Sequence, residues 1–440
     1  MAHNNRPMRR SALIGPWGVG AIVPFPNDES LMIAGLDMWR YNDATPFVIK
    51  DERLLRRLGV QELRWPPDFR ENNADPQNCF LKIPAVRFPT WHYCPFCGTM
   101  EKTTFYQQQP ECECYPWPNG RKCNPAFRHR RKLIPERFIV ICPDGHIDDF
   151  PVAEWLHQDA GYRYNPETCK IRRSTGGTSA SLSGVYYECT CGARKNIAGA
   201  TRPGALSKIG YRCKGSKPWL GIDSDEEHPC GRTDVRVVLR GATNVWFADT
   251  RSSIYIPTDD EQATKKIIAI LDEFFDVLSA MRVDGEWNRG FIDMLAERHR
   301  VDKNELYNAF IRRDQGLEGL PDVTEEISED EYRLAEYNVL IKSSGGDAQR
   351  FHSKNYPISY YDPVISKYFK SISLVHKLQE TRAFVGFSRA EPSEMPISER
   401  KKMLRLGSEN WLPAIQVHGE GIFFEFNKEA VEEWAQRPAV

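Results

Sequence analysis

Residues 137–151 read RFIVICPDGHIDDFP, and this stretch decides how the middle of the chain is organised. An apolar, β-prone run at 138–141 leads Cys142 into a Pro-Asp-Gly turn, and His146 follows four residues after the cysteine. A thiol and an imidazole on either side of a tight turn can face one metal ion. Two carboxylates, Asp148 and Asp149, come next. The stretch therefore predicts a strand that ends in a metal-binding turn.

Further cysteines lie on both sides of this stretch. They are Cys94-x-x-Cys97 upstream, and Cys189-x-Cys191, Cys213 and Cys230 downstream. The chain has 12 cysteines in 440 residues and shows no signal-peptide pattern. In a reducing compartment such thiols bind metal rather than form disulfides. We therefore expect a cytoplasmic, metal-stapled protein. No membrane partner is expected, because no uncharged apolar run reaches the ~18 residues of a membrane span.

The downstream cysteines predict one structural zinc ion. The four proposed ligands are Cys189, Cys191, Cys213 and Cys230. Four thiolates complete a tetrahedral zinc shell and leave no open position for water. This Zn²⁺ is therefore expected to fold the segment rather than to catalyse a reaction.

A second zinc ion is predicted at the upstream pair. We expect its ligands to be Cys94, Cys97, Cys142 and His146, because the turn at 142–146 can aim two of them at one ion. Two of a nearer trio could instead complete the site, and the trio could also hold a further ion. This trio is Cys112, Cys114 and Cys123. The remaining two cysteines, Cys79 and Cys169, are interpreted as buried free thiols.

No catalytic residue is predicted. The chain lacks a Walker A loop, a His-Glu-x-x-His helix and a Gly-x-Ser-x-Gly elbow. An alternative is a metal-dependent nuclease that uses His146, Asp148 and Asp149. Their place inside a cysteine knuckle favours hydrogen bonding to the local backbone.

Any contact with DNA must be local, because 59 basic residues nearly balance 60 acidic ones. The predicted contacts are Arg128, Arg130, Arg131 and Lys132 beside the first zinc, and Arg172 and Arg173 in a polar loop at 170–184. Arginines interleaved with aromatics suit contact with a nucleic-acid backbone. The alternative is an ordinary solvated face.

The pattern of the whole chain predicts a multi-domain α+β protein. We expect a strand-rich part at 1–90, a loop-rich, zinc-stapled module at 91–258, and a helical region that returns to strands at 259–440. Predicted strands include 21–25, 30–36, 185–189, 234–240 and 411–426. Predicted helices are 51–59, 260–282, 287–300, 303–312, 326–341, 363–380 and 428–435.

Seven stretches of this sequence carry a resemblance to a known family. They are 9–23 (RRSALIGPWGVGAIV), 34–39 (AGLDMW), 137–151, 189–193 (CTCGA), 213–219 (CKGSKPW), 240–247 (RGATNVWF) and 412–423 (LPAIQVHGEGIF). They follow the family's order and cover nearly the whole chain. The sequence resembles the DrmB family, the helicase-partner subunit of the DISARM anti-phage defence system.

The resemblance implies a non-catalytic accessory subunit that pairs with a superfamily-2 helicase and helps it to engage DNA. It also implies a further C-terminal, cysteine-bearing domain, which this sequence, ending at Val440, does not include. A pure protein–protein scaffold without DNA contact is the remaining alternative.

Overall fold

The computed structural model describes most of the chain. The described residues are 8–69, 76–118, 121, 123, 131–158, 161, 163–175, 182–221, 230–256, 259–282, 285–314, 329–341, 349–392 and 396–437. The chain folds into two compact units. Unit 1 comprises residues 1–48, 64–251 and 383–415, and unit 2 comprises 49–63, 252–382 and 416–440.

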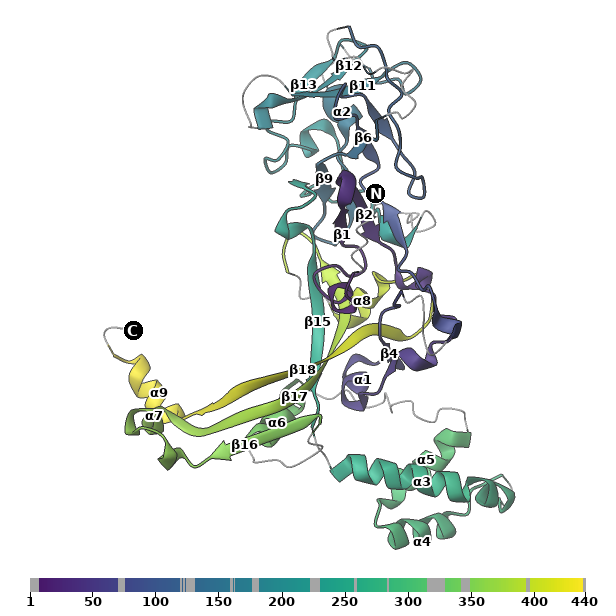
Figure 1. The fold of residues 1–440 in the computed structure, drawn as a ribbon, viewed down its shortest axis with the longest axis vertical. Helices are drawn as coiled ribbons and strands as arrows, with labels where there is room; N and C mark the ends of the chain where they lie inside the picture. Colours follow the sequence, from purple (N-terminus) through teal and green to yellow (C-terminus); the bar gives the residue numbers. More distant parts are fainter. Residues whose placement is uncertain are drawn as a thin grey trace. The chain divides into compact units, whose positions relative to one another are not determined.

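The described residues of unit 1 form four small antiparallel sheets of three strands each. Their strand orders are β1 (Ile22–Phe25), β2 (Glu29–Ile33), β5 (Ala85–Arg87); β7 (Met100–Lys102), β6 (Trp91–Tyr93), β8 (Ile134–Pro135); β10 (Ile147–Asp149), β9 (Phe138–Ile141), β14 (Arg236–Leu239); and β11 (Ile171–Thr175), β12 (Val185–Cys189), β13 (Arg194–Asn196). Figure 1 shows β11, β12 and β13 grouped with the short helix α2 (Val152–Leu156). Sheets of three strands need packing against other elements, and an apolar core that includes residues of β9, α2, β11 and β12 supplies it here.

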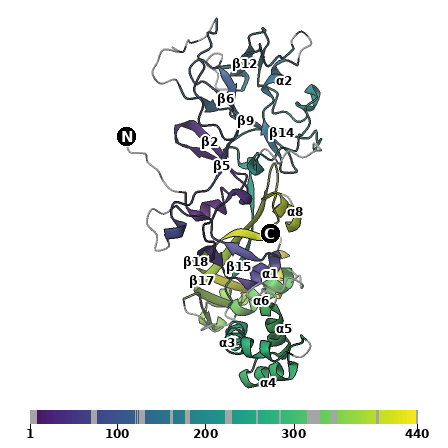
Figure 2. The same ribbon diagram turned by 90° about the vertical axis from the view of Figure 1, so that its right-hand side faces the viewer.

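Strand β9 lies in the centre of its sheet, which explains its unbroken apolar sequence. All four of its side chains are buried, and β10 pairs with one edge of β9 while β14 pairs with the other. Figure 2 shows β14 beside β9. Beside this sheet, the ring of Phe150 packs against Trp155 of α2 and Tyr187 of β12. One apolar core therefore joins the 137–151 stretch to the β11–β12 hairpin.

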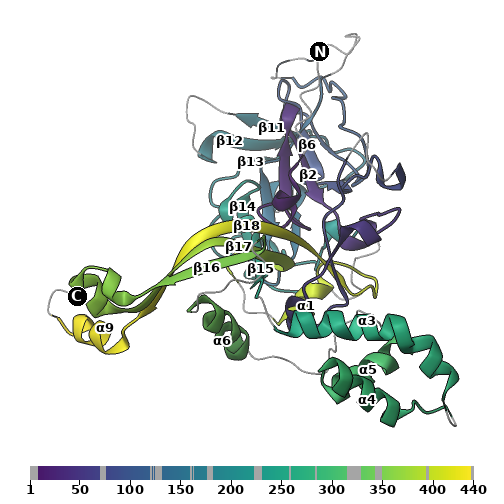
Figure 3. The ribbon, with the colours of Figure 1, turned by 60° about the horizontal axis from the view of Figure 1, so that its bottom comes forward.

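A six-stranded sheet collects strands from distant parts of the sequence. Its order is β15 (Phe247–Ile254), β17 (Phe369–Ser388), β18 (Trp411–Phe426), β4 (Glu62–Arg64) and β3 (Val48–Ile49), and β16 (Phe351–Tyr356) also pairs with β17. Figure 3 shows β16, β17 and β18 side by side. The helix predicted over 363–380 is therefore wrong beyond Tyr368. Only α7 (Pro363–Tyr368) is helical, and the following residues form β17 because they pair along β16.

The other helices of unit 2 follow the predicted pattern closely. They are α1 (Glu52–Leu58), α3 (Asp259–Ala280), α4 (Arg289–His299), α5 (Lys303–Asp314), α6 (Glu329–Leu340) and α9 (Lys428–Ala435). Unit 1 contains α8 (Ile397–Lys402), which was not predicted. Helix α1 begins where the Asp51 carboxylate accepts the Leu54 N–H at 3.0 Å, and it ends at Gly59 in the left-handed conformation.

The prediction of an α+β fold is confirmed by this mixture of separate sheets and helices. The three-part division at residues 90 and 258 stays a prediction. The polar loop expected at 170–184 is wrong for its first part, because residues 171–175 form β11 and pair with all of β12. None of the described helices combines the length and apolar character that crossing a bilayer requires.

Candidate metal centres

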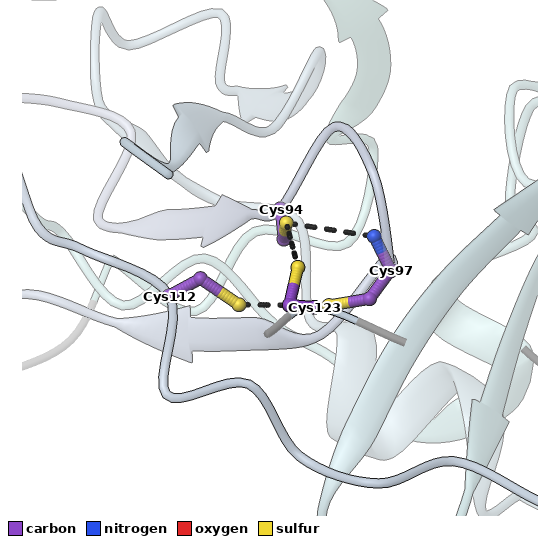
Figure 4. A group of neighbouring side chains, drawn as sticks. All are labelled: Cys94, Cys97, Cys112 and Cys123. Atoms are coloured by element: carbon purple, nitrogen blue, oxygen red, sulfur yellow. Dashed lines mark hydrogen bonds between the residues drawn. The ribbon is translucent and has the colours of Figure 1, made fainter. Parts of the chain in front are cut away.

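Among the described residues of unit 1, cysteine and histidine side chains converge in three groups. The first group consists of Cys94, Cys97, Cys112 and Cys123, all of them buried (Figure 4). The Sγ atoms of Cys94 and Cys123 are 3.6 Å apart, and those of Cys97 and Cys112 are 3.5 Å apart. Zinc–sulfur bonds of about 2.3 Å in a tetrahedron place sulfur atoms about 3.8 Å apart. The first cluster therefore has nearly the spacing of a four-thiolate zinc site.

A tight knuckle after β6 shapes the first cluster. The amides of Phe96 and Cys97 both donate to the Cys94 sulfur, at 3.4 and 3.5 Å, and the Gly98 amide donates to the Cys94 carbonyl at 3.0 Å. Gly98 has φ +77°, and a Cβ there would lie 2.1 Å from the Arg173 carbonyl oxygen. The knuckle therefore requires glycine at this position for two separate reasons.

Protons are unevenly shared among the thiols of the first cluster. Hydrogen bonds from the Cys112 and Cys94 side chains lower the pKa of Cys97 far below its ordinary value. Hydrogen bonds with the Cys94 and Cys97 side chains, together with burial, raise the pKa of Cys112. A bound cation would favour the thiolate form of these cysteines, because metal-ligating sulfurs are deprotonated.

The second cluster is built around the turn at 142–146. It consists of Cys142, His146, Cys213 and Cys230. The Cys142 and Cys230 sulfur atoms are 3.9 Å apart, and His146 Nδ1 lies 3.6 Å from the Cys213 sulfur. Backbone hydrogen bonds between Cys213 and the Gly231–Arg232 pair bring Cys213 close to Cys230. Three thiols and one imidazole again match a structural zinc site.

A buried arginine holds the turn of the second cluster. Arg389 is 0% exposed and donates to the carbonyls of Gly145 at 2.9 Å, Val245 at 2.8 Å and Gly20 at 2.8 Å. Its guanidinium also stacks on Trp219 and Phe387. Burial lowers the pKa of Arg389 to about 9. The guanidinium of Arg389 therefore joins three loops that are far apart in the sequence, beside the turn at 142–146.

The third cluster consists of His157, Cys169, Cys189 and Cys191. His157 Nε2 lies 3.3 Å from the Cys191 sulfur. The sequence reasoning missed His157, which directly follows a short helix, and interpreted Cys169 as a free thiol. The sequence offered no signal for His157. Cys169 was visible as a cysteine, but only the pairing of β11 with β12 brings it to Cys189.

The structure groups the eight predicted ligands differently from the sequence interpretation. Cys94 and Cys97 meet two members of the competing trio, because the Cys112 amide donates to the Arg131 carbonyl at 2.8 Å and folds that segment back. Cys142 and His146 instead meet Cys213 and Cys230. Cys189 and Cys191 then belong to the third cluster. Cys114 is in none of the three clusters, although its amide donates to the Cys112 sulfur.

The two carboxylates of the central stretch have structural partners. Asp149 is 8% exposed and accepts the backbone N–H groups of Thr90 at 2.8 Å and Trp91 at 3.2 Å. Asp148 accepts the Tyr211 hydroxyl at 3.0 Å and lies 3.4 Å from the Lys214 ammonium. Neither carboxylate is among the described residues that converge with His146.

The predicted DNA-contact residues fall into three groups. Arg128 and Arg130 lie outside the described residues. Arg131 and Lys132 are exposed; the Arg131 guanidinium stacks on Phe96 of the first knuckle, and Lys132 pairs with Glu111 at 2.9 Å. Arg172 and Arg173 are instead directed into the fold. Arg172 pairs with Glu188, and Arg173, whose side chain is 8% exposed, pairs with the buried Glu136 at 3.5 Å.

Comparisons with known proteins agree with this picture. A family model described as a domain of unknown function (DUF8724) matches residues 9–247, which is more than half of the chain. The chain is also 29% identical over 426 residues to the "DISARM protein DrmB" of Bacillus paralicheniformis. That match covers 93% of this chain and 68% of the relative. The chain belongs to the DrmB family. The resemblance inferred from its motifs is thereby confirmed.

In this DrmB-family chain, the region matched by DUF8724 contains every ligand of the three clusters.

Proposed function

We propose that this chain is an accessory subunit of a DISARM anti-phage defence complex. It pairs with a superfamily-2 helicase and contributes a DNA-binding surface, without catalysing a reaction itself. The observation that carries the proposal is the similarity to a DISARM protein along 93% of the chain. Cytoplasmic location is part of the same proposal, since the complex would meet phage DNA inside the cell.

Zinc is the proposed ion at the first two clusters. Four thiolates at one, and three thiolates with an imidazole at the other, are ligand sets that structural zinc uses. The buried core around the first cluster consists of its own four cysteines and Leu133, so an ion there would stabilise a segment that has little other apolar packing. An ion at the second cluster would join the separate segments that carry its ligands. Such closed ligand shells leave no position for a reacting water.

The proposed DNA contacts begin at Arg131 and Lys132. Both side chains are exposed, and the stacking of Arg131 on Phe96 links this basic segment to the first metal knuckle. Positive charge next to a rigid knuckle suits contact with phosphates, which fixes position rather than sequence. Arg128 and Arg130 belong to the same proposed surface. The ion pairs of Arg172 and Arg173 favour a structural role for that second patch.

The geometry favours this proposal over the nuclease alternative. A nuclease would need His146, Asp148 and Asp149 to bind one catalytic ion. His146 Nδ1 instead faces the Cys213 thiol, and the Asp149 carboxylate is occupied by the backbone of residues 90 and 91. The scaffold alternative is separated from the proposal only by a measurement of DNA binding.

The test is a DNA-binding titration across a salt series. The purified chain, the partner helicase and their mixture are compared, each with wild-type chain and with Arg131→Glu/Lys132→Glu. We expect weak binding by the chain alone and stronger binding by the mixture than by the helicase. The double variant should make the salt dependence of the mixture shallower by about 1 in log–log slope for each lost phosphate contact.

A matched charge control is Arg56→Glu/Arg298→Glu, which reverses two exposed arginines on α1 and α4. The mixture that contains this control variant should show the same salt dependence of DNA binding as the mixture with wild-type chain. The DNA role is refuted if the mixture binds DNA no better than the helicase alone and if the salt dependence of binding is the same with wild-type chain and with Arg131→Glu/Lys132→Glu. Co-purification of chain and helicase in that case would support the scaffold.

A further inference from the structure

The third cluster brings together four potential ligands from three elements of unit 1. His157 directly follows α2, Cys169 precedes β11, and Cys189 ends β12, with Cys191 in the turn after it. Their ligand atoms all lie within 4.8 Å of one another. Free thiols and an imidazole that merely fill a core have no reason to converge in this way.

The hydrogen bonding of His157 leaves its Nε2 atom, which faces the other members of the cluster, available to bind a metal ion. Its Nδ1 lies 2.8 Å from the Ala153 carbonyl oxygen, one helical turn earlier. A carbonyl can only accept, so in the neutral imidazole Nδ1 carries the proton and Nε2 carries a lone pair. Nε2 is the atom that lies 3.3 Å from the Cys191 sulfur. Metal-binding histidines are oriented by this kind of hydrogen bond from their other nitrogen.

The two close cysteines sit in a knuckle of their own. The Gly192 amide donates to the Cys189 carbonyl at 3.0 Å, and the Cys189 amide donates to the Ala193 carbonyl at 2.9 Å. The Asn165 amide donates to the Cys169 sulfur at 3.4 Å, as the amides of the first knuckle do to Cys94. Three sulfur atoms and one nitrogen on prearranged backbone match a tetrahedral zinc shell.

Exposure distinguishes this cluster from the other two. Cys191 is exposed, whereas every ligand of the first cluster is buried and the second has only Cys230 half-buried. A chelator can therefore reach one ligand of the third cluster without opening the fold. The β11–β12 hairpin and α2 would be joined through this accessible site.

We propose that His157, Cys169, Cys189 and Cys191 bind a third zinc ion, which exchanges with solvent faster than the ions of the other two clusters. The proposal rests on the geometry of this cluster and does not depend on the DNA-binding or helicase role. It assigns a ligand role to His157 and Cys169.

The first test counts zinc by elemental analysis in the purified full-length chain. We expect three equivalents in the wild type and two in His157→Ala/Cys191→Ala. Loaded with Co²⁺, the double variant should lose about three tenths of the thiolate-to-metal charge-transfer absorbance, because three of ten cluster thiolates lose their ion. Equal zinc content in the wild type and the double variant would overturn the proposal.

Two further variants keep the test decisive if the double variant does not fold. His157→Cys should retain three equivalents and gain about one tenth in charge-transfer absorbance, since a thiolate replaces the imidazole at that ion. Unchanged absorbance would show that residue 157 is not a ligand. Cys79→Ser, which alters a cysteine outside the three clusters, should change neither reading.

The exchange rate is tested with a chromogenic chelator in excess. The wild type should release one equivalent in a fast phase and two in a slow phase, and His157→Ala/Cys191→Ala should lack the fast phase. Release of all three ions in one phase would refute the faster exchange.

Discussion

The carboxylate of Asp149 binds the backbone of Thr90, 59 residues earlier in the chain, with 2.8 Å between Oδ1 and the amide nitrogen. The Thr90 hydroxyl donates to the other carboxylate oxygen, and the Trp91 amide to the first at 3.2 Å. These hydrogen bonds fix the start of β6 against the β10–β9–β14 sheet. The first metal knuckle follows β6, and the turn of the second cluster joins β9 to β10. One buried side chain, that of Asp149, therefore connects the two clusters.

Removal of this carboxylate should therefore destabilise unit 1. Asp149→Ala would leave the Thr90 and Trp91 amides without their acceptor and should cost about 3 kcal/mol. Asp148→Asn keeps one acceptor oxygen, so it loses either the Tyr211 hydroxyl or the Asp149 amide as a partner, together with the partly exposed pair with Lys214, and should cost only about 1 kcal/mol. Thermal unfolding of the zinc-loaded variants measures both. Equal losses at the two positions would contradict the structural role of Asp149.

Gly98→Ala should disturb the first cluster without touching a ligand. The new methyl group would meet the Arg173 carbonyl, and the residue would keep an unfavourable positive φ. We expect a loss of about 2 kcal/mol or more and weaker retention of one zinc equivalent against a chelator. Gly241→Ala is the matched control, because nothing lies within 4 Å of a Cβ at that exposed position. An unperturbed Gly98→Ala protein would show that the knuckle is looser than described.

Cys112 and Cys114 should differ sharply although they are two residues apart. Cys112→Ser removes a proposed ligand of the first cluster and should cost one zinc equivalent or lower its affinity at least 10-fold. Cys114→Ser alters a cysteine outside all three clusters and should keep the wild-type metal content. Elemental analysis after dialysis against a weak chelator compares the two. The opposite ranking would transfer the ligand role to Cys114.

A pH effect is expected at the start of α1. Burial raises the pKa of Asp51 above its ordinary value, against hydrogen bonds from Leu54, Thr381 and Ser253. A carboxyl whose pKa is higher in the folded state favours folding while protonated, and this contribution is lost as the pH rises through the folded pKa. Asp51→Asn keeps a capping oxygen without the charge.

The stability of Asp51→Asn relative to the wild type should therefore rise as the pH is raised above about 4, the ordinary pKa of an aspartate, until the folded-state carboxyl is fully ionised. Thermal midpoints of both proteins, measured in excess zinc at each pH, provide the difference. Because both proteins share every proposed zinc ligand, acid-induced loss of metal affects them alike. A difference that is constant or falls with pH would contradict a raised pKa at Asp51.

Local chemistry made much of the fold predictable from the sequence. The 138–141 run is β9, and the acidic start and terminal glycine of 51–59 mark α1 within one residue at each end. The strands around the turn at 26–28 pair as β1 and β2. In each case, neighbouring residues supply both the propensity and the stop signal.

Long-range pairing decided what the sequence could not reveal. Residues 369–380 have apolar positions compatible with either a helix or a strand, and the pairing with β16 selects the strand. The cysteine spacings showed which residues could bind metal but not their partners, since partners depend on how strands such as β11 and β12 pair. His157 has no metal motif around it, and only the fold brings it to Cys191.

The order of the ligands along the chain has a consequence for how this protein assembles. The first cluster is complete once Cys123 has been synthesised. The loop from His157 to Cys191 lies entirely inside the loop from His146 to Cys213. An ion at the inner site would roughly halve the outer loop and ease its closure by about 0.6 kcal/mol. The nested loops therefore favour metal loading from the inside outward, while Arg389, synthesised much later, joins the finished loops at Gly145, Val245 and Gly20.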